Sequence, residues 1–533
     1  MQITLSYTVC ACTPWNPFYD FVGEYTLKSR KTPEEVEAEK EFMKSQGIAR
    51  KVSNQKFERK SVFEIKGDTC FFLIGFWARL REELEKHNEQ FTIIDKRDPS
   101  LKPIPDYSKL QGTQFRQGQL EAIATIATSD CGLICSSVGW GKSFVIKQLC
   151  KIYPKTNILI VCPAGEVVKE LYRDINNELP GEAGLLNMDS NNIDGKRIIV
   201  TTCKSMVKLN PERVQLMLVD EAHGTGDGAY GQQVMQFSFC RRFGFTATPI
   251  RNSGDYKFFE ALYGPILQQV TYQESQDAGS VTPIKYSMVS LGHRLPYLEN
   301  LVEVVDDLGR LVYRERNAVL ETDTLTGKTK PRDLPDTVRN KLFYWNNRMR
   351  NRAVVQVFNQ VKAANPNIQI LIMTQSLAHL IRIAEMLPEL RWMHGERGNL
   401  DKYRKQKDLQ EVNLKKYELD NKKAKWVKHC LETGEIQYGI STGCLSAGVN
   451  LKHLAVLIRV DGAASGIPSV QIPGRLARLD EGKDCAYLID FADDFCEPAV
   501  SRAKSRQKEY DKQGWQEISF VDCLNELRKE NEK

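Results

Sequence analysis

The chain has 533 residues and a mass of 60.8 kDa, which at about 150 residues per domain predicts three to four domains. Hydrophobic residues make up 41% of the sequence, enough to build sizeable cores, and this excludes wholesale disorder. Lys and Arg number 74 against 68 Asp and Glu, a net charge of +6, so any surface for nucleic acid has to be local.

Membrane and disulfide-rich classes are disfavoured. No apolar run reaches the roughly 18 residues of a membrane span, and the first residues, MQITLSYTVCACTPW, lack the basic leader of a secretory signal. None of the 14 cysteines forms a C-x-x-C pair, and many sit in apolar runs, which predicts reduced buried thiols and no structural zinc. We therefore expect a soluble, intracellular protein without membrane contact.

Residues 1–105 predict a small α+β accessory domain. Apolar spacing predicts a helix from Phe76 to His87, with strands at 63–65 and 91–94. Thr32-Pro-Glu-Glu predicts the start of another helix, because Pro and acids suit the first helical turn. The proline-rich residues 98–105 mark a domain boundary.

Two segments then alternate short apolar strands with helical stretches, which predicts an α/β fold with two parallel-sheet domains. In the first, residues 106–285, strands are expected at 132–135, 157–161, 197–200, 216–219 and 243–245. In the second, residues 351–505, they are expected at 368–373, 438–442, 455–460 and 486–491. Residues 286–350 are expected to connect the two, 397–429 to form a Lys-rich helical insertion, and 506–533 to form a charged C-terminal tail.

A phosphate-binding loop is predicted at Ser136–Ser143, between a strand and an amphipathic helix. Its sequence, SSVGWGKS, fits G-x-x-x-x-G-K-[ST] except that a serine replaces the first glycine. The glycines let backbone N–H groups curl around a polyphosphate at the helix N-terminus. Lys142 is predicted to reach the β- and γ-phosphates and Ser143 to hold Mg²⁺. The alternative is an ordinary strand–turn–helix junction. The residues predicted to bind nucleotide here are Ser137, Val138, Gly139, Trp140, Gly141, Lys142 and Ser143.

Two adjacent carboxylates follow the apolar strand at 216–219, at the edge of a parallel sheet where ligands bind. Asp220 is predicted to position Mg²⁺, and Glu221 to orient and deprotonate the attacking water. The alternative is a solvated turn. His223, behind Asp-Glu-Ala, is a candidate for linking the nucleotide state to the rest of the domain.

With these motifs on one sheet, the chain resembles the superfamily 2 helicases and translocases. Further motifs follow in the family's order, ending in Gln471-Ile-Pro-Gly-Arg-Leu-Ala-Arg478, a match to the specific pattern Q-x-x-G-R-x-x-R. The earlier ones are Ile158–Pro163, Thr201–Ser205, Thr246–Pro249, Ile370–Ser376 and Ala447–Asn450. The resemblance implies two RecA-like motor domains, ATP and Mg²⁺ as cofactors, and ATP hydrolysis coupled to unwinding. Ser136 and Trp140 depart from the family's pattern.

The resemblance also assigns roles to individual residues. Arg475 and Arg478 are expected to cross the interdomain cleft and stabilise charge on the γ-phosphate. Gln119 is expected to pair with the adenine edge. The implied catalytic residues are Lys142, Glu221, Gln471, Arg475 and Arg478; Arg116, Gln119 and Gly448 join the nucleotide-binding set; and His223, Thr246 and Thr248 are the coupling residues.

Nucleic acid is expected along a surface to which hydroxyls and backbone amides offer phosphate contacts. The residues implied are Ala164, Gly165, Thr202, Lys204, Ser205, Thr374, Gln375, Ser376 and Thr442. The Lys-rich insertion has two interpretations, a solvated helical arm or a second contact to duplex.

The front of the chain, with its proline-rich link into Phe115-Arg-Gln-Gly-Gln119, is similar to phage UvsW-type helicases, which remodel branched DNA. This implies a DNA-binding N-terminal domain and forked or junction DNA as the partner, in replication, recombination or repair. It also implies action as a monomer, in the cytoplasm of a phage-infected or bacterial cell and near the nucleoid.

Other functions stay open at the level of sequence. A translocase that remodels nucleoprotein without strand separation, an RNA helicase and a nucleotide-dependent switch share most of these motifs. A motor-linked nuclease would use Glu64 and Lys66 of an E-x-K pattern, with Asp20 as the second acid.

Overall fold

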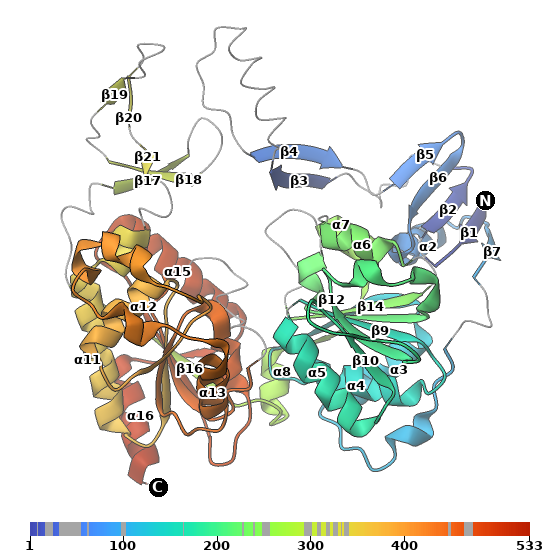
Figure 1. Cartoon of the computed structure of the whole chain (residues 1–533). Helices are drawn as coiled ribbons and strands as arrows, with labels where there is room; N and C mark the ends of the chain where they lie inside the picture. The colour runs from blue at the N-terminus through green and yellow to red at the C-terminus, as the bar shows by residue number, and fades with distance from the viewer. Residues whose placement is uncertain are drawn as a thin grey trace. The chain divides into compact units, whose positions relative to one another are not determined.

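The computed structural model divides into two compact units, Met1–Ala278 and Gly279–Lys533 (Figure 1). No helix in the described residues is both long enough and apolar enough to cross a membrane. The residues that the structure describes are 1–7, 9–15, 25–30, 55–60, 63–97, 103–163, 165–225, 229–237, 240–247, 256–292, 301–305, 311–315, 320–322, 329–331, 333–334, 340–445, 449–462 and 473–532.

Some predictions lie outside these residues. They are the helix start at Thr32, the nuclease acid Asp20, and the site residues Ala164, Thr248, Gly448 and Gln471.

The first unit opens with a five-stranded sheet of order β5-β6-β2-β1-β7. Its strands are β1 (Gln2–Leu5), β2 (Val9–Thr13), β5 (Phe63–Lys66), β6 (Thr69–Leu73) and β7 (Thr92–Asp95). The predicted helix is confirmed as α2 (Trp77–Lys86), which follows the short turn η1 (Ile74–Phe76) and buries Leu80 and Leu84. A separate two-stranded hairpin is formed by β3 (Tyr25–Arg30) and β4 (Gln55–Lys60).

The rest of the first unit is an eight-stranded sheet of order β11-β10-β12-β9-β13-β14-β8-β15, parallel except at β11. All five predicted strands are present. The strands are β8 (Cys131–Ser136), β9 (Ile158–Cys162), β10 (Ala183–Leu186), β11 (Asn191–Asn192), β12 (Ile198–Thr202), β13 (Leu216–Asp220), β14 (Arg241–Thr246) and β15 (Ile266–Val270). The helices are α3 (Gln119–Thr128), α4 (Lys142–Ile152), α5 (Gly165–Glu178), α6 (Ala229–Met235), α7 (Tyr256–Tyr263) and α8 (Tyr272–Asp277).

This sheet is buried on both faces, which is why its strands read as continuous apolar runs. Alternate residues of β9 point to opposite sides: Ile158 and Ile160 join the core under α3, α4 and α5, whereas Leu159 and Val161 join the core shared with α7 and the N-terminal sheet. The N-terminal sheet therefore packs directly on the eight-stranded sheet.

The second unit holds a seven-stranded sheet of order β23-β24-β22-β25-β26-β16-β27, in which each of these neighbouring pairs is parallel. Its strands are β16 (Ile284–Val289), β22 (Gln369–Met373), β23 (Arg391–Met393), β24 (Tyr438–Ser441), β25 (Leu454–Arg459), β26 (Ala486–Phe491) and β27 (Gln516–Glu517). Its helices are α11 (Arg348–Ala364), α12 (Leu377–Met386), α13 (Asn421–Glu432), α15 (Glu497–Lys512) and α16 (Phe520–Glu532). Short strands β17 (Leu301–Val305), β18 (Leu311–Glu315), β19 (Leu320–Thr322), β20 (Thr329–Pro331) and β21 (Asp333–Leu334) form two small sheets.

The structure differs from the predicted organisation in three places: one domain boundary, the C-terminal segment and the Lys-rich insertion. The boundary at residue 285 falls inside β16, which pairs with β26 and so belongs to the second sheet. Residues 506–533 are not a detached tail, because Cys523 and Leu527 of α16 are buried in the second core. The 397–429 segment is not a protruding arm: it forms three short 3₁₀ turns and most of α13, and it buries Leu400, Leu409, Leu414 and Tyr417 in that core.

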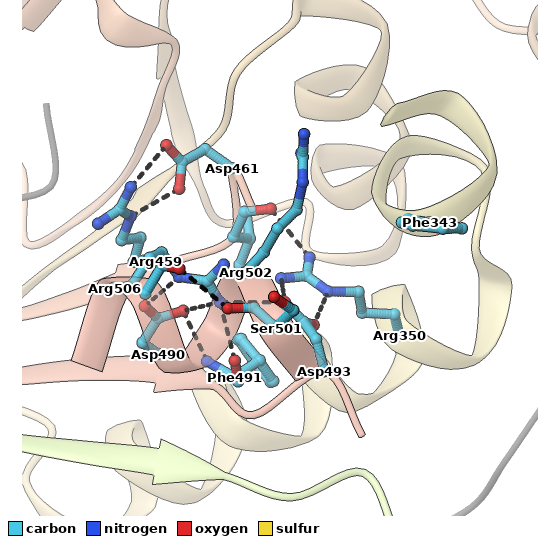
Figure 2. A network of polar contacts seen from close by, with 12 residues as sticks. Phe343, Arg350, Arg459, Asp461, Asp490, Phe491, Asp493, Ser501, Arg502 and Arg506 are labelled. Carbon is cyan, nitrogen blue, oxygen red and sulfur yellow. Dashed lines mark hydrogen bonds and ion pairs between the residues drawn. The ribbon is translucent and has the colours of Figure 1, made fainter. Parts of the chain in front are cut away.

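A buried ionic network ties α11 and α15 to the ends of β25 and β26 (Figure 2). Arg506 contacts both Asp490, at 2.7 Å, and Asp493, at 3.0 Å. Arg350 donates to Asp493 at 2.6 Å, and Arg459 pairs with Asp461 at 2.7 Å. Three guanidinium groups thus face three carboxylates, so the buried charge is balanced.

Candidate active site

The predicted phosphate-binding loop lies at the carboxyl end of β8 and leads into α4. Gly139 and Gly141 have φ values of 90° and 109°, a region that favours glycine. A Cβ on Gly141 would also lie 2.6 Å from Nε2 of Gln119. These two glycines are therefore required by the local backbone, as the motif predicts.

Trp140, the bulky departure from the family's pattern, turns its ring away from the loop's solvent side. The side chain is fully buried in the core under α3 and α4, and its indole N–H donates to the carbonyl of Gln117 at 2.9 Å. The side chain of Trp140 therefore anchors the loop to the core, and the prediction that the loop binds nucleotide through its backbone amides stays a prediction at this position.

Gln119 and Arg116 brace the same loop from the start of α3. The Gln119 carboxamide donates to the carbonyl of Trp140 at 2.8 Å and accepts from the backbone N–H of Arg116 at 2.9 Å. The Arg116 guanidinium donates to the carbonyl of Gly139 at 2.9 Å. Because Gln119 is only 2% exposed, its carboxamide holds the loop in this structure and does not present a free edge to a base.

The carboxylates lie where predicted, at the carboxyl end of β13. Asp220 is buried and accepts from the backbone N–H of Glu221 at 3.0 Å. Glu221 has a φ of 47°, and this left-handed turn directs its side chain to Lys142, whose Nζ lies 3.5 Å from Oε1. The phosphate-loop lysine and the candidate base are thus brought together from two strands.

The two neighbouring carboxyl groups have pKa values that are shifted in opposite directions. Burial, and then the neighbouring Glu221 carboxylate, raise the pKa of Asp220 above its usual range. Burial also disfavours the charged form of Glu221, but Lys142 and His223 outweigh it and lower the pKa of Glu221. Glu221 is therefore ionised at neutral pH, as a group that orients water requires.

His223 bridges the carboxylates to the next strand. Its Nδ1 lies 3.3 Å from Oε2 of Glu221 and 3.2 Å from Oγ1 of Thr246, the last residue of β14. Thr246 is fully buried. One ring nitrogen thus contacts both the candidate base and the last residue of β14.

The donor set fits a polyphosphate with a divalent cation. Ser143 exposes its hydroxyl beside the backbone amides of the loop, and Asp220 brings a buried carboxylate whose charge burial disfavours. A hydroxyl and a carboxylate are hard oxygen ligands of the kind Mg²⁺ prefers. Ser137 is also held in place here, with its Oγ 3.0 Å from Oγ of Ser275. Val138, the next residue of the loop, is half-buried.

In the second unit, the two predicted arginines converge on one carbonyl. Arg475 donates to the carbonyl of Val449 at 2.5 Å, and Arg478 donates to the same oxygen at 2.8 Å and to Oδ1 of Asn450 at 2.5 Å. The structure thus brings the last motif together with the Ala447–Asn450 motif. Sequence spacing did not reveal this shared carbonyl, since the two motifs lie about 25 residues apart.

The predicted nucleic-acid residues divide by exposure. Lys204 and Gln375 are exposed, and Gly165, Thr202, Ser376 and Thr442 are half-buried. Thr374 and Ser205 are buried, and the Thr374 hydroxyl donates to the carbonyl of Ser441 at 3.2 Å. A phosphate contact at Thr374 or Ser205 therefore has no exposed hydroxyl to use in this structure, and it stays a prediction.

The nuclease alternative gains no support from the described residues. Glu64 and Lys66 lie on the edge strand β5 and pair with each other at 3.1 Å, each about two-thirds exposed. No group of three or more His, Cys, Asp or Glu side chains that could hold a metal ion is found in the described part of the chain.

Taken together, the parallel sheets, the phosphate loop and the order of the motifs resemble those of superfamily 2 helicases and translocases. The family described as "Type III restriction enzyme, res subunit" matches residues 112–251.

Two curated relatives are similar in sequence. "DNA 3'-5' translocase XPB2" of Sulfurisphaera tokodaii is 27% identical over 164 residues, which is 30% of this chain and 37% of that protein. "Putative helicase 22" of a Sulfolobus islandicus filamentous virus is 22% identical over 305 residues, 55% of this chain and 46% of that protein. The chain thus spans less than half the length of each.

Solved structures agree on the fold. S. cerevisiae Dbp5 bound to RNA and ADP BeF3 aligns with a TM-score of 0.51 and 11% identity, covering 82% of this chain and 98% of that one. T4 UvsW aligns with a TM-score of 0.37 and 12% identity, over 98% of this chain and 100% of that one, a likeness too low to decide a branch of the superfamily.

Proposed function

We infer that the chain is an ATP-dependent helicase or translocase that acts on nucleic acid, with forked or junction DNA as its substrate in replication, recombination or repair. The observation that carries this proposal is the Lys142–Glu221–His223–Thr246 series at the carboxyl edge of the first sheet. It joins the phosphate loop, the candidate base and the next motif within one set of contacts.

ATP would supply the phosphoanhydride whose hydrolysis drives movement along a strand. The backbone amides around Gly139 and Gly141 would hold the polyphosphate, and Lys142 would exchange its contact with Glu221 for the phosphates. Ser143 and Asp220 would hold Mg²⁺.

Glu221, released from Lys142, would orient a water and accept its proton. Arg475 and Arg478 would stabilise developing charge on the γ-phosphate, as arginine fingers do. His223 would report the state of Glu221 to Thr246 and so to the segment that follows it. We propose that the enzyme acts as a monomer.

The test is the steady-state ATPase rate with no nucleic acid, single-stranded DNA, duplex, forked DNA, a four-way junction or RNA. We expect strongest stimulation by the branched DNAs. Stimulation by RNA alone would replace DNA with RNA as the substrate, and a strand-displacement assay on naked DNA separates unwinding from translocation without unwinding.

Variants at the site complete this test. Lys142→Ala is expected to abolish ATP turnover while leaving most of the nucleic-acid affinity, and Glu221→Gln to retain ATP binding but lose about 10²- to 10⁴-fold in hydrolysis. Glu212→Gln, an exposed acid of the same unit, is the matched control. Retained turnover in Lys142→Ala would contradict the site assignment.

A further inference from the structure

An exposed stripe on α13 combines one tryptophan with basic side chains. Lys422, Lys425, Trp426 and His429 are exposed and follow the spacing i, i+3, i+4 and i+7, which places them on one side of a helix. The opposite side is buried in the second unit, through Ala424, Val427, Cys430 and Leu431. We call the four exposed residues the α13 stripe.

Trp426 is unusual within this chain. The sequence has seven tryptophans, all within the described residues, and the other six are buried or half-buried. Trp426 is 55% exposed, and no aromatic or cationic partner of its ring is found in the described part of the structure. The Trp426 ring therefore offers a large, flat apolar face to a ligand, with basic side chains on either side of it.

The lysines of the stripe are available to a ligand. Among the described residues no acid forms an ion pair with Lys422 or Lys425. The nearby acids are engaged elsewhere: Asp420 accepts from the backbone N–H of Lys423, and Glu432 accepts from the backbone N–H of Asn450. The stripe is therefore positively charged around an aromatic face.

The position of α13 relates the stripe to the candidate nucleic-acid residues of the same unit. The helix ends at Thr433–Gly434, beside the start of β22 at Gln369, in a polar hollow at the amino ends of the strands. Its first turn lies at the opposite, carboxyl edge. There Arg397 joins the carbonyl of His394, just after β23, to the side chain of Asn421.

The carboxyl edge also carries Thr442, whose backbone N–H donates to the carbonyl of Met393 at the end of β23. Lys423 lies 5.5 Å from the ring centre of Trp392 on β23, which fixes the first turn of α13 against that strand. The stripe thus begins near the edge where Thr442 and Gln375 are found, and it runs from there along α13 toward the amino edge of the sheet.

We propose that the α13 stripe binds an unpaired strand of nucleic acid, with the Trp426 indole stacked on a base and Lys422 and Lys425 on flanking phosphates. Phosphates match the charge of the stripe, and every base offers a flat face to an indole, so this contact needs no particular sequence. The inference rests on the proposed function and extends its strand-binding surface beyond the motif residues.

The experiment measures binding of fluorescein-labelled dT₂₀, U₂₀ and a blunt 20-base-pair duplex by the full chain, without nucleotide, at several salt concentrations. Trp426→Ala is expected to weaken single-strand binding about tenfold and to leave duplex binding unchanged. Trp426→Phe, which keeps an aromatic face, is expected to recover most of the loss. Lys422→Ala and Lys425→Ala should each reduce the slope of log K against log salt by about 0.7.

Two controls lie on α16, where Val521 and Lys529 are exposed. Val521→Ala and Lys529→Ala are expected to match the wild type in every arm, and Trp426→Ala to keep the basal ATPase rate measured without nucleic acid.

Three results would overturn the proposal. If Trp426→Ala binds both single strands with wild-type affinity, the α13 stripe is not a strand-binding site, and the proposed function is unaffected. If Trp426→Ala loses as much affinity for the duplex as for the single strands, stacking of the indole on an unpaired base is excluded. A wild-type chain that binds none of the three oligonucleotides removes the proposed function and this inference together.

Discussion

The carboxamide of Gln119 donates a hydrogen bond to the carbonyl of Trp140, 2.8 Å away, and thereby holds the phosphate loop from the start of α3. The indole of Trp140 in turn donates to the carbonyl of Gln117. The residues around the start of α3 and the loop are thus joined by two hydrogen bonds, one from the Gln119 side chain and one from the Trp140 side chain, and the unusual tryptophan is part of the loop's support.

Gln119→Ala is expected to lower kcat/KM for ATP about tenfold, because it removes a buried hydrogen bond on which the loop conformation depends. Since the carboxamide contacts the loop, kcat/KM for GTP should fall by the same factor. The measurement is steady-state hydrolysis of both nucleotides, with Gln117→Ala, whose side chain is exposed, as the matched control. A loss confined to ATP would return Gln119 to reading the adenine edge.

The sequence was sufficient for the motor sheets because buried parallel strands are apolar runs that end at polar motifs. The predicted runs at 216–219 and 243–245 both end at polar motifs, and the structure pairs their strands, β13 and β14, side by side. The predicted boundary at residue 285 divides the strand Ile284–Val289 because its partner, β26, lies about 200 residues further along the chain. Nothing local in the sequence indicates that pairing.

Side-chain direction was the second limit. Trp140 sits in a motif that is predicted to bind nucleotide, yet its ring enters the core, and a loop has no periodicity from which to predict this. Leu400, Leu409 and Leu414 are separated by irregular intervals in a Lys-rich stretch, so no helical face could be recognised before the 3₁₀ turns were seen. The exposure of the Trp426 side chain could not be predicted from the sequence either.

His223→Ala is expected to leave the basal ATPase rate within about twofold and to reduce the stimulation by nucleic acid about tenfold, a typical coupling energy. The reason is that Nδ1 contacts both Glu221 and Thr246. Thr246→Val, which removes only the hydroxyl, should give the same uncoupling. ATPase titrations with forked DNA provide the measurement, and His87→Ala, an exposed histidine of α2, is the control.

A double mutant tests whether the two residues act through one contact. If they do, His223→Ala combined with Thr246→Val is no worse than either change alone. If the losses of stimulation in the two single variants add up in the double variant, His223 and Thr246 do not act through one contact.

Arg506→Met is expected to destabilise the second unit by about 3–5 kcal/mol, because Asp490 and Asp493 would stay buried without their common partner. The measurement is hydrogen exchange of the β26 amides in increasing urea. Lys504→Ala, an exposed residue of the same helix, should leave that protection unchanged. Wild-type protection in Arg506→Met would show that the network contributes little.

The same network predicts a pH dependence. Burial alone would raise the pKa of Asp490, but Arg506 and then Arg459 outweigh it and hold the pKa below its ordinary value of 3.8. A carboxyl whose pKa is lowered on folding stabilises the fold above its unfolded pKa and loses that contribution as the pH falls through the folded value. Protection of β26 should therefore persist from neutral pH to about 4 and decline in stronger acid. In Asp490→Asn this acid-dependent step should shrink.

Gly75→Ala is expected to loosen the N-terminal sheet from the first motor sheet. A Cβ at Gly75 would lie 2.4 Å from the carbonyl oxygens of Glu260 and Ala261 and 2.6 Å from the amide nitrogen of Gly264, all backbone atoms at the end of α7. Because backbone cannot move aside as a flexible side chain does, we expect a cost of about 1–3 kcal/mol. The Arg79–Glu260 ion pair, at 2.6 Å, spans the same contact and should open with it.

Limited proteolysis reads this change directly, because cleavage near α2 depends on how often it leaves α7. Gly75→Ala should be cut several times faster there than the wild type. Gly224→Ala is the control, since a Cβ at that position meets no atom within 4 Å. Tyr263 of α7 also contacts Thr225 beside the Asp220–His223 motif, at 2.6 Å between their hydroxyls. If α7 relays the position of the accessory sheet, Gly75→Ala will alter stimulation by branched DNA more than the basal ATPase rate, and equal loss of both rates would limit the contact to stability.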